Sequence, residues 1–177
     1  MNAPDLSLSR LMGTPQSLEK LVIACVLAES QRVGAQPLIR GLGAISFNLL
    51  CTTCLPDMAL DNGVAERPLF DEFEELFELL IEHAEPMDQM SIWLAAAIAT
   101  AAQRDNHLWQ DMGLPSRREL SAILNLRFPR LAAANNADMK WKKFFYRQLC
   151  QRAGVPICKS PQCGDCSDQS LCFGPET

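Results

Sequence analysis

The sequence predicts an all-α fold: a helical bundle followed by an irregular, cysteine-rich loop. Three observations support this prediction. Several segments repeat apolar residues at helical spacing, helix start and stop signals bound them, and no segment shows the sustained apolar–polar alternation of a strand. The chain has 177 residues, of which 48% are hydrophobic and 21% charged, so it is long and apolar enough to bury a core.

The first predicted helices are marked by caps and apolar faces. Thr14-Pro15 is typical of an N-cap followed by the first helical position. The next helix, within residues 68–84, has an apolar face and an opposite acidic face. The uncharged run Gln89–Gln103 is fifteen residues long, shorter than the roughly 20 residues that cross a membrane. We therefore interpret that run as a buried helix.

Two further helices follow. Ser116 and Glu119 are spaced as a capping box, and Phe128-Pro129 is expected to stop the helix that they begin. The last helix is predicted from about Asn136 to Arg152, where Gly154 and Pro156 end it. We divide the chain accordingly into a helical domain, residues 1–153, and a cysteine loop, residues 154–177, which is expected to pack on the last helix.

Net charge and the N-terminus restrict the class of protein. A net charge of −5 and a pI near 5.0 disfavour general binding to nucleic acid, which requires a basic surface. The first residues lack the basic head and apolar run of a signal peptide. We therefore expect a cytoplasmic protein with no membrane association. In that reducing compartment, clustered thiols are more often metal ligands than disulfides.

The cysteine loop holds four of the eight cysteines within fifteen residues, spaced C-x4-C-x2-C-x5-C. These candidate metal ligands are Cys158, Cys163, Cys166 and Cys172. Local disulfides would close very short loops and add little stability. A zinc site is the stronger alternative, but it usually uses two C-x2-C pairs about a dozen or more residues apart. An iron–sulfur cluster is favoured, because the first three cysteines of the loop have the spacing C-x4-C-x2-C. The first three cluster ligands of plant-type ferredoxins have the same spacing.

The other four cysteines receive simpler interpretations. Cys25 lies on the apolar stripe of its helix and is predicted to be a core residue. Cys51 and Cys54 form a second C-x2-C in helical sequence, for which packing is favoured over ligation. Cys150 lies three residues after Arg147, so its thiolate is a candidate for stabilisation by that cation, with a structural role as the alternative.

A basic stripe on the last helix stands out in an acidic protein. Lys140, Lys143 and Arg147 share one face of the predicted helix. A solvated face is the default interpretation; capture of an oxyanion, compensation of cluster charge and docking of an acidic partner are the functional ones. His107 is a second candidate for contact with a metal or oxyanion, with an ordinary hydrogen-bonded histidine as the alternative. His83 is expected to be solvated.

Three motifs together resemble the NifQ family of nitrogen fixation. They are HLWQDMGL at 107–114, MKWKKFFYRQLC at 139–150, and the cysteine motif with its CFGPE ending at 158–176. The similarity runs from about Phe70 to Glu176, whereas the first sixty or so residues match poorly. The three motifs occur in the family's order, so the resemblance is specific.

The resemblance implies a carrier with no catalytic activity. Such proteins hold a molybdenum–iron–sulfur cluster and supply molybdenum for assembly of the nitrogenase iron–molybdenum cofactor. The implied cofactors are an iron–sulfur cluster of 4Fe–4S or Mo–3Fe–4S type and molybdenum. The implied partners are the cofactor-assembly scaffold, dinitrogenase reductase, and molybdate or a molybdenum storage or delivery source. The cluster ligands carried over are Cys158, Cys163, Cys166 and Cys172, with His107, Cys150, Lys143 and Arg147 as candidates for accessory contacts to metal or oxyanion.

Two functions from other classes stay open at this point. The ferredoxin-like spacing of the first three loop cysteines also suits an electron-transfer iron–sulfur protein. A zinc-stabilised helical interaction module is the other alternative.

Overall fold

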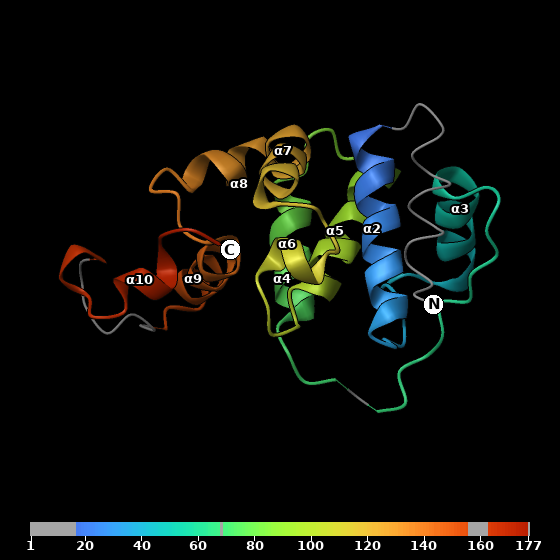
Figure 1. The fold of residues 1–177 in the computed structure, drawn as a ribbon, viewed down its shortest axis with the longest axis horizontal. Helices are drawn as coiled ribbons and strands as arrows, with labels where there is room; N and C mark the ends of the chain where they lie inside the picture. Colours follow the sequence, from blue (N-terminus) through green and yellow to red (C-terminus); the bar gives the residue numbers. More distant parts are fainter. Residues whose placement is uncertain (1–16, 68, 156–162, 177) are drawn as a thin grey trace.

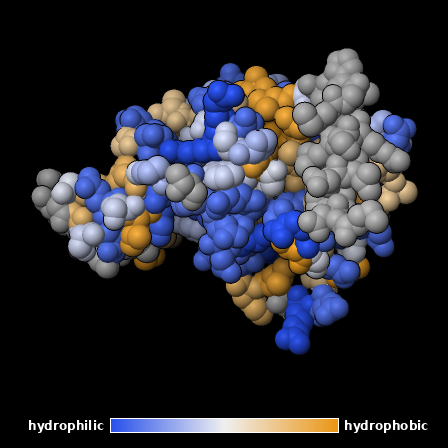
Figure 2. Space-filling view, in the orientation of Figure 1, coloured by the Kyte–Doolittle hydropathy of each residue, from blue (hydrophilic) through white to orange (hydrophobic). Residues whose placement is uncertain are grey.

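The computed structural model describes residues 17–67, 69–155 and 163–176. Over these ranges the chain forms nine α-helices and one short 3₁₀ helix, and no strand (Figure 1). The predicted all-α fold is therefore confirmed. The helices α9 and α10 lie at one end of the molecule and α3 at the other. On the face shown in Figure 2, apolar side chains are scattered among hydrophilic ones.

Short loops connect most of the helices. In chain order the elements are α2 (Leu18–Arg32), α3 (Ala44–Cys54), α4 (Phe73–Glu82), α5 (Gln89–Ala101), α6 (Leu108–Asp111), α7 (Arg117–Arg127), α8 (Pro129–Ala134), α9 (Trp141–Ala153), the 3₁₀ helix η1 (Cys163–Asp165) and α10 (Gln169–Cys172).

Helix α5 forms the centre of the core. It packs against both α2 and α4, and every residue from 93 to 102 is buried. A helix that is apolar on all sides must be surrounded by protein or lipid. Here the neighbouring helices surround it, as the uncharged run Gln89–Gln103 predicted. None of the helices in the described ranges has the length and apolarity needed to cross a membrane.

Helix α2 begins at Leu18, one residue after its cap. The Ser17 hydroxyl accepts a hydrogen bond from the backbone N–H of Lys20 at 3.4 Å, which satisfies one of the free N–H groups of the first turn. The predicted cap at Thr14-Pro15 lies outside the described residues. Residues 22–28 of the helix are all buried, so α2 supplies a second wall of the core.

The amphipathic pattern of α4 is confirmed. Phe73, Leu76, Leu79 and Leu80 are buried, while the acidic residues of the helix face solvent. The expectation for His83 is wrong: this residue ends α4 half-buried, with Nδ1 2.8 Å from the carbonyl oxygen of Leu79. The carbonyl groups in the last turn of a helix lack backbone N–H partners, and here the imidazole of His83 contacts one of them.

Helix α7 begins at the predicted cap. The Ser116 hydroxyl accepts a hydrogen bond from the Arg118 N–H at 3.2 Å and donates to the carboxylate of Glu119. The helix ends at Arg127 as predicted, and Pro129 then becomes the first residue of α8, a position at which proline loses no hydrogen bond.

The predicted start of α9 is wrong by five residues. The helix begins at Trp141 rather than near Asn136. The side chain of Asn135 accepts from the N–H of Met139 and donates to its carbonyl, both at 2.8 Å. Asp138 has a φ of 54°, which lies outside the right-handed helical region. These features make a turn before the helix, whereas its end at Gly154 is as predicted.

The loop after Gly154 is irregular only in part. The helices η1 and α10 lie within it and contact each other. Sequence reasoning missed both, because a helix of three or four residues has no apolar period to detect.

Candidate metal centre

The second half of the cysteine loop lies against the beginning of α9. The backbone N–H of Lys140 donates to the carbonyl of Cys172 at 2.7 Å, and Lys140 Nζ donates to the carbonyl of Ser170 at 3.1 Å. Cys163, Cys172 and Phe173 are partly buried against the apolar core. Hydrogen bonds from Lys140 and apolar contacts thus attach the loop to the helical bundle.

Three of the four predicted ligands fall within the described residues. Cys163, Cys166 and Cys172 carry free thiols and are half-buried, while Cys158 lies outside the described residues. Within the described ranges, no three histidine, cysteine or carboxylate side chains are close enough to hold one metal ion. The set of four ligands therefore stays a prediction.

Arg147 connects the basic stripe to the thiols. Its Nη1 donates a hydrogen bond to Sγ of Cys163 at 3.4 Å. Lys143, one helical turn earlier, is exposed and lines a pocket to which Leu171 and Glu176 of the loop also contribute. Among the described residues, Arg147 therefore contacts a thiol of the loop and Lys143 does not.

His107 lies beside the end of the cysteine loop. It precedes α6, and its backbone N–H donates to Oε1 of Gln110 at 3.1 Å. Its Nδ1 is 3.9 Å from Oε1 of Glu176. The other carboxylate oxygen of Glu176 lies 3.2 Å from Nε of Arg117, and the Glu176 side chain is only 2% exposed. The ion pair with Arg117 therefore links the end of the loop to α7, and the imidazole of His107 lies beside the same carboxylate.

Sequence reasoning missed Glu176 and Arg117 as a pair. Each stands in a recognisable motif, Glu176 in CFGPE and Arg117 in the capping box, but they are 59 positions apart. Only the fold brings them together, so no local signal could have indicated the contact.

A buried charge network also escaped the sequence analysis. Asp111 is 2% exposed, and its carboxylate accepts hydrogen bonds from the backbone N–H of Asn106 at 3.0 Å and from Lys142 Nζ. Lys142 Nζ also donates to the Arg104 carbonyl at 2.5 Å. The network fastens α9 to the segment between α5 and α6. Asp111 of the motif HLWQDMGL and Lys142 of the motif MKWKKFFYRQLC thus form an ion pair within the fold.

Gly113 in the same motif allows close packing. Its φ is +69°, and a Cβ there would lie 2.7 Å from the carbonyl oxygen of Cys25 on α2. Real Cβ contacts are never so short, so only glycine fits this crossing. The motif thereby positions the chain around His107 against the core.

Three of the remaining four cysteines are core residues. Cys25, Cys51 and Cys54 are buried in the core, as predicted. Burial raises the pKa of Cys25, which also lies near the charge of Glu119, to about 11; burial likewise raises the pKa of Cys54 to about 11. Thiols of this kind are poor metal ligands and nucleophiles. Cys150 is half-buried on α9 and joins no group of three metal-binding side chains in the described ranges.

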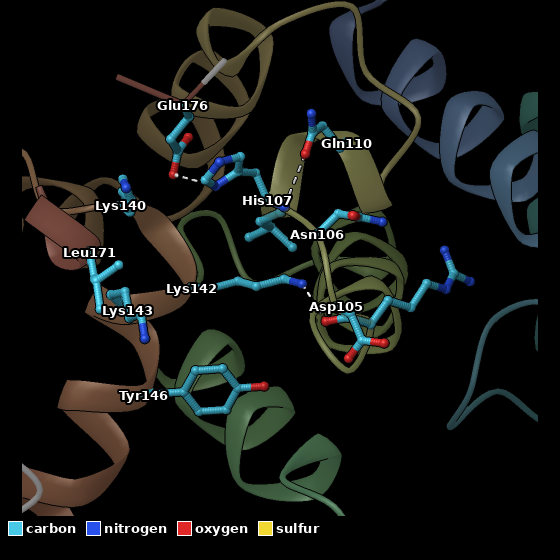
Figure 3. Close-up of a pocket in the computed structure, with 12 residues that line it drawn as sticks. Asp105, Asn106, His107, Gln110, Lys140, Lys142, Lys143, Tyr146, Leu171 and Glu176 are labelled. Carbon is cyan, nitrogen blue, oxygen red and sulfur yellow. Dashed lines mark hydrogen bonds and ion pairs between the residues drawn. The ribbon is translucent and has the colours of Figure 1, made fainter. Parts of the chain in front are cut away.

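A pocket of about 470 Å³ opens between α6 and α9, beside the cysteine loop. Figure 3 shows three lysines, Lys140, Lys142 and Lys143, projecting from the α9 side, with His107 and Glu176 at the opposite wall. The structure thus brings two predicted accessory residues, His107 and Lys143, to one pocket.

Comparison with known proteins identifies the family. A sequence model of the NifQ family matches residues 21–174. The chain belongs to the NifQ family. The match begins well before Phe70, so α2 and α3 are part of the family's sequence pattern as well. Membership in the NifQ family gives the chain a role in nitrogen fixation and molybdenum processing.

Curated NifQ relatives match at substantial identity. Protein NifQ of Azotobacter vinelandii is 44% identical over 167 residues, covering 85% of this chain and 86% of that protein. Protein NifQ of Rhodobacter capsulatus is 38% identical over 157 residues, covering 85% and 87%. Protein NifQ of Klebsiella pneumoniae is 39% identical over 127 residues, covering 63% and 76%. No solved structure shows significant similarity.

Proposed function

We propose that this NifQ-family chain is a non-catalytic molybdenum carrier. Its cargo is a molybdenum–iron–sulfur cluster held by the cysteine loop, and it supplies molybdenum for assembly of the nitrogenase iron–molybdenum cofactor. The observation that carries the proposal is the group of free, half-buried thiols on the cysteine loop, one of which, Cys163, accepts a hydrogen bond from the cation of Arg147.

The donor set suits such a cargo. Thiolates are soft ligands that favour iron–sulfur clusters over hard cations such as magnesium or calcium. The ligands in this proposal are Cys158, Cys163, Cys166 and Cys172. In a cubane with one molybdenum corner, three thiolates hold the three irons, and the fourth holds molybdenum or serves an all-iron form. Molybdenum also accepts oxygen and nitrogen ligands, which makes it the more exchangeable corner.

Partial exposure of the thiols supports release as well as binding. Cys163, Cys166 and Cys172 are only partly buried, and within the described ranges they form no ready-made single-ion site. A cluster must enter and leave a carrier, so ligands near the surface suit this role better than core thiols such as Cys25. Arg147 supplies positive charge where thiolates and sulfide accumulate negative charge.

The proposed partners follow from the cargo. Molybdate or a molybdenum storage or delivery source supplies the metal, and the cofactor-assembly scaffold receives it, with dinitrogenase reductase as a further partner. A net charge of −5 favours partners with basic docking surfaces.

A transfer experiment tests the donor role. The full chain is loaded anaerobically with iron, sulfide and radiolabelled molybdate, separated from free label, and mixed with the cofactor-assembly scaffold. We expect label to move to the scaffold faster than from free molybdate at the same concentration. A cluster that cycles reversibly between redox states but takes up no molybdenum would instead indicate electron transfer. Zinc as the sole metal would indicate a structural module.

A further inference from the structure

We infer that the pocket between α6 and α9 binds a tetrahedral oxyanion of charge −2, at a place separate from the thiols of the cysteine loop. We call it the anion pocket. Its identification as an anion site rests on its own side chains. The further step, that the anion is molybdate awaiting insertion, rests on the proposed function.

The anion pocket has room for such a ligand. Its volume of about 470 Å³ far exceeds the roughly 30 Å³ that one water molecule occupies in the liquid. Its walls come from α9 on one side and from the segment around His107 on the other (Figure 3). Leu171 and Glu176 of the cysteine loop complete the lining.

Cations dominate the lining. Four cationic side chains face two carboxylates: Arg104, Lys140, Lys142 and Lys143 against Asp105 and Glu176. One of these carboxylates, Glu176, is already paired with Arg117. The other, Asp105, is exposed to solvent, where water and salt weaken its influence. The carboxylate of Asp111 offsets the charge of Lys142, and the guanidinium of Arg104 donates to Ser30 and to the Asp111 carbonyl. The positive field in the anion pocket therefore comes from Lys140 and Lys143.

Two of the lysines retain donors for a ligand. Lys143 makes no hydrogen bond or ion pair with any of the described residues, and Lys140 Nζ donates only to the carbonyl of Ser170. An ammonium group has three donors, so Lys140 can hold the loop and an anion together. Lys142 and Arg104 are committed to the network around Asp111, so the anion would be held by Lys140 and Lys143.

The position of the anion pocket links it to the thiols. Leu171, which lines it, is followed directly by Cys172. Lys140 bonds both the carbonyl of Cys172 and that of Ser170. An anion held by Lys140 and Lys143 therefore lies beside the chain segment that carries Cys172. Arg147, one turn after Lys143, serves the other half of the loop through Cys163.

Molybdate binding to cluster-free, full-length protein tests the inference by equilibrium dialysis at low salt. We expect saturable binding that Lys143→Glu weakens by at least about tenfold, because a contact to a charged group is lost and a repulsive one gained. Lys143→Arg should restore most of the affinity. Arg67→Glu is the matched control, because it changes the net charge by the same amount as Lys143→Glu. Arg67 is an exposed cation in the loop between α3 and α4, away from the anion pocket.

Three results would overturn the inference: no saturable molybdate binding to the wild type, unchanged binding in Lys143→Glu, or an equal loss in Arg67→Glu. Circular dichroism confirms that each variant is folded, and Lys140→Gln provides a second variant that should also weaken molybdate binding.

The test is independent of the cluster. Cys166→Ser should still bind molybdate, and Lys143→Glu should still take up iron and sulfide, so failure of either proposal is seen separately.

Discussion

Arg147 Nη1 donates a hydrogen bond to Sγ of Cys163 across 3.4 Å, and this contact ties the aromatic helix α9 to the cysteine loop. The Arg147 side chain is anchored on a helix that buries Trp141, Phe144 and Phe145 in the core. A rigid support of this kind keeps the guanidinium beside the thiol at little entropic cost.

Replacement of Arg147 should weaken retention of a cluster. The loss of one partly exposed, charge-assisted contact amounts to about 1 kcal/mol, or roughly fivefold in the rate of iron loss. We expect Arg147→Ala to lose iron to a chelator about fivefold faster than the wild type. Arg152→Ala is the control, because Arg152 lies on the same helix but pairs with Glu82. Equal rates in the two variants would remove Arg147 from the site.

Thiol reactivity should separate the cysteine loop from the core. At pH 8, only about one in a thousand Cys54 thiols is ionised, because burial raises its pKa to about 11. We expect iodoacetamide to label Cys163, Cys166 and Cys172 at least about a hundredfold faster than Cys25 and Cys54 in native, cluster-free protein. Peptide mass spectrometry gives the rates residue by residue.

Denaturant provides the control for that experiment. Core and loop thiols should then react at similar rates, because burial no longer protects Cys25 and Cys54. Native labelling of Cys54 as fast as that of Cys166 would contradict the packing described for α3.

The Asp111–Lys142 pair should be essential for stability. Asp111→Asn leaves the ammonium of Lys142, which is 14% exposed, without its charged partner. Breaking a buried pair on one side costs about 3 kcal/mol, measurable as a lower free energy of unfolding in urea. Asp105→Asn is a matched control on the neighbouring exposed carboxylate and should change stability by less than about 0.5 kcal/mol. Similar losses in both variants would mean that the network contributes nothing specific.

Asp88 should contribute to the acid sensitivity of the fold. The backbone N–H of Ser91, which donates to the Asp88 carboxylate at 2.9 Å, and the guanidinium of Arg127 lower the pKa of Asp88. A group with a lowered folded-state pKa adds stability above its unfolded pKa and loses it as pH falls through the folded one. Below about pH 4, the free energy of unfolding should therefore fall less steeply in Asp88→Asn than in the wild type.

Asparagine is also a good N-cap, so this variant keeps the start of α5 intact and isolates the charge. Glu74→Gln on the exposed face of α4 serves as the control and should follow the wild-type curve. Parallel curves for Asp88→Asn and the wild type would show that this carboxylate has no role in acid unfolding.

The helices could be predicted where their position depends only on neighbouring residues in the sequence. The buried run around residues 89–103, the cap at Ser116 and the stop at Gly154 depend only on neighbouring residues, and the structure agrees with each. The start of α9 could not be predicted, because the side chain of Asn135 competes with the helix for the backbone of Met139.

The candidate site was predictable as a set of residue types but not as an arrangement. Spacing indicated the loop thiols, and charge periodicity indicated Lys143 and Arg147. Their separation, Arg147 on Cys163 and Lys143 in the anion pocket, depends on how the loop packs on α9. The burial of Glu176 between His107 and Arg117 depends on contacts between segments far apart in sequence, which no local pattern encodes.

The most direct test of the carrier proposal is a count of iron, sulfide and molybdenum per chain in anaerobically prepared protein. Wild type and the core control Cys54→Ala should contain all three, whereas Cys166→Ser should lose most of its iron together with its molybdenum. Zinc as the sole metal in the wild type, or a full cluster in Cys166→Ser, would contradict the proposal that the cysteine loop holds the cargo.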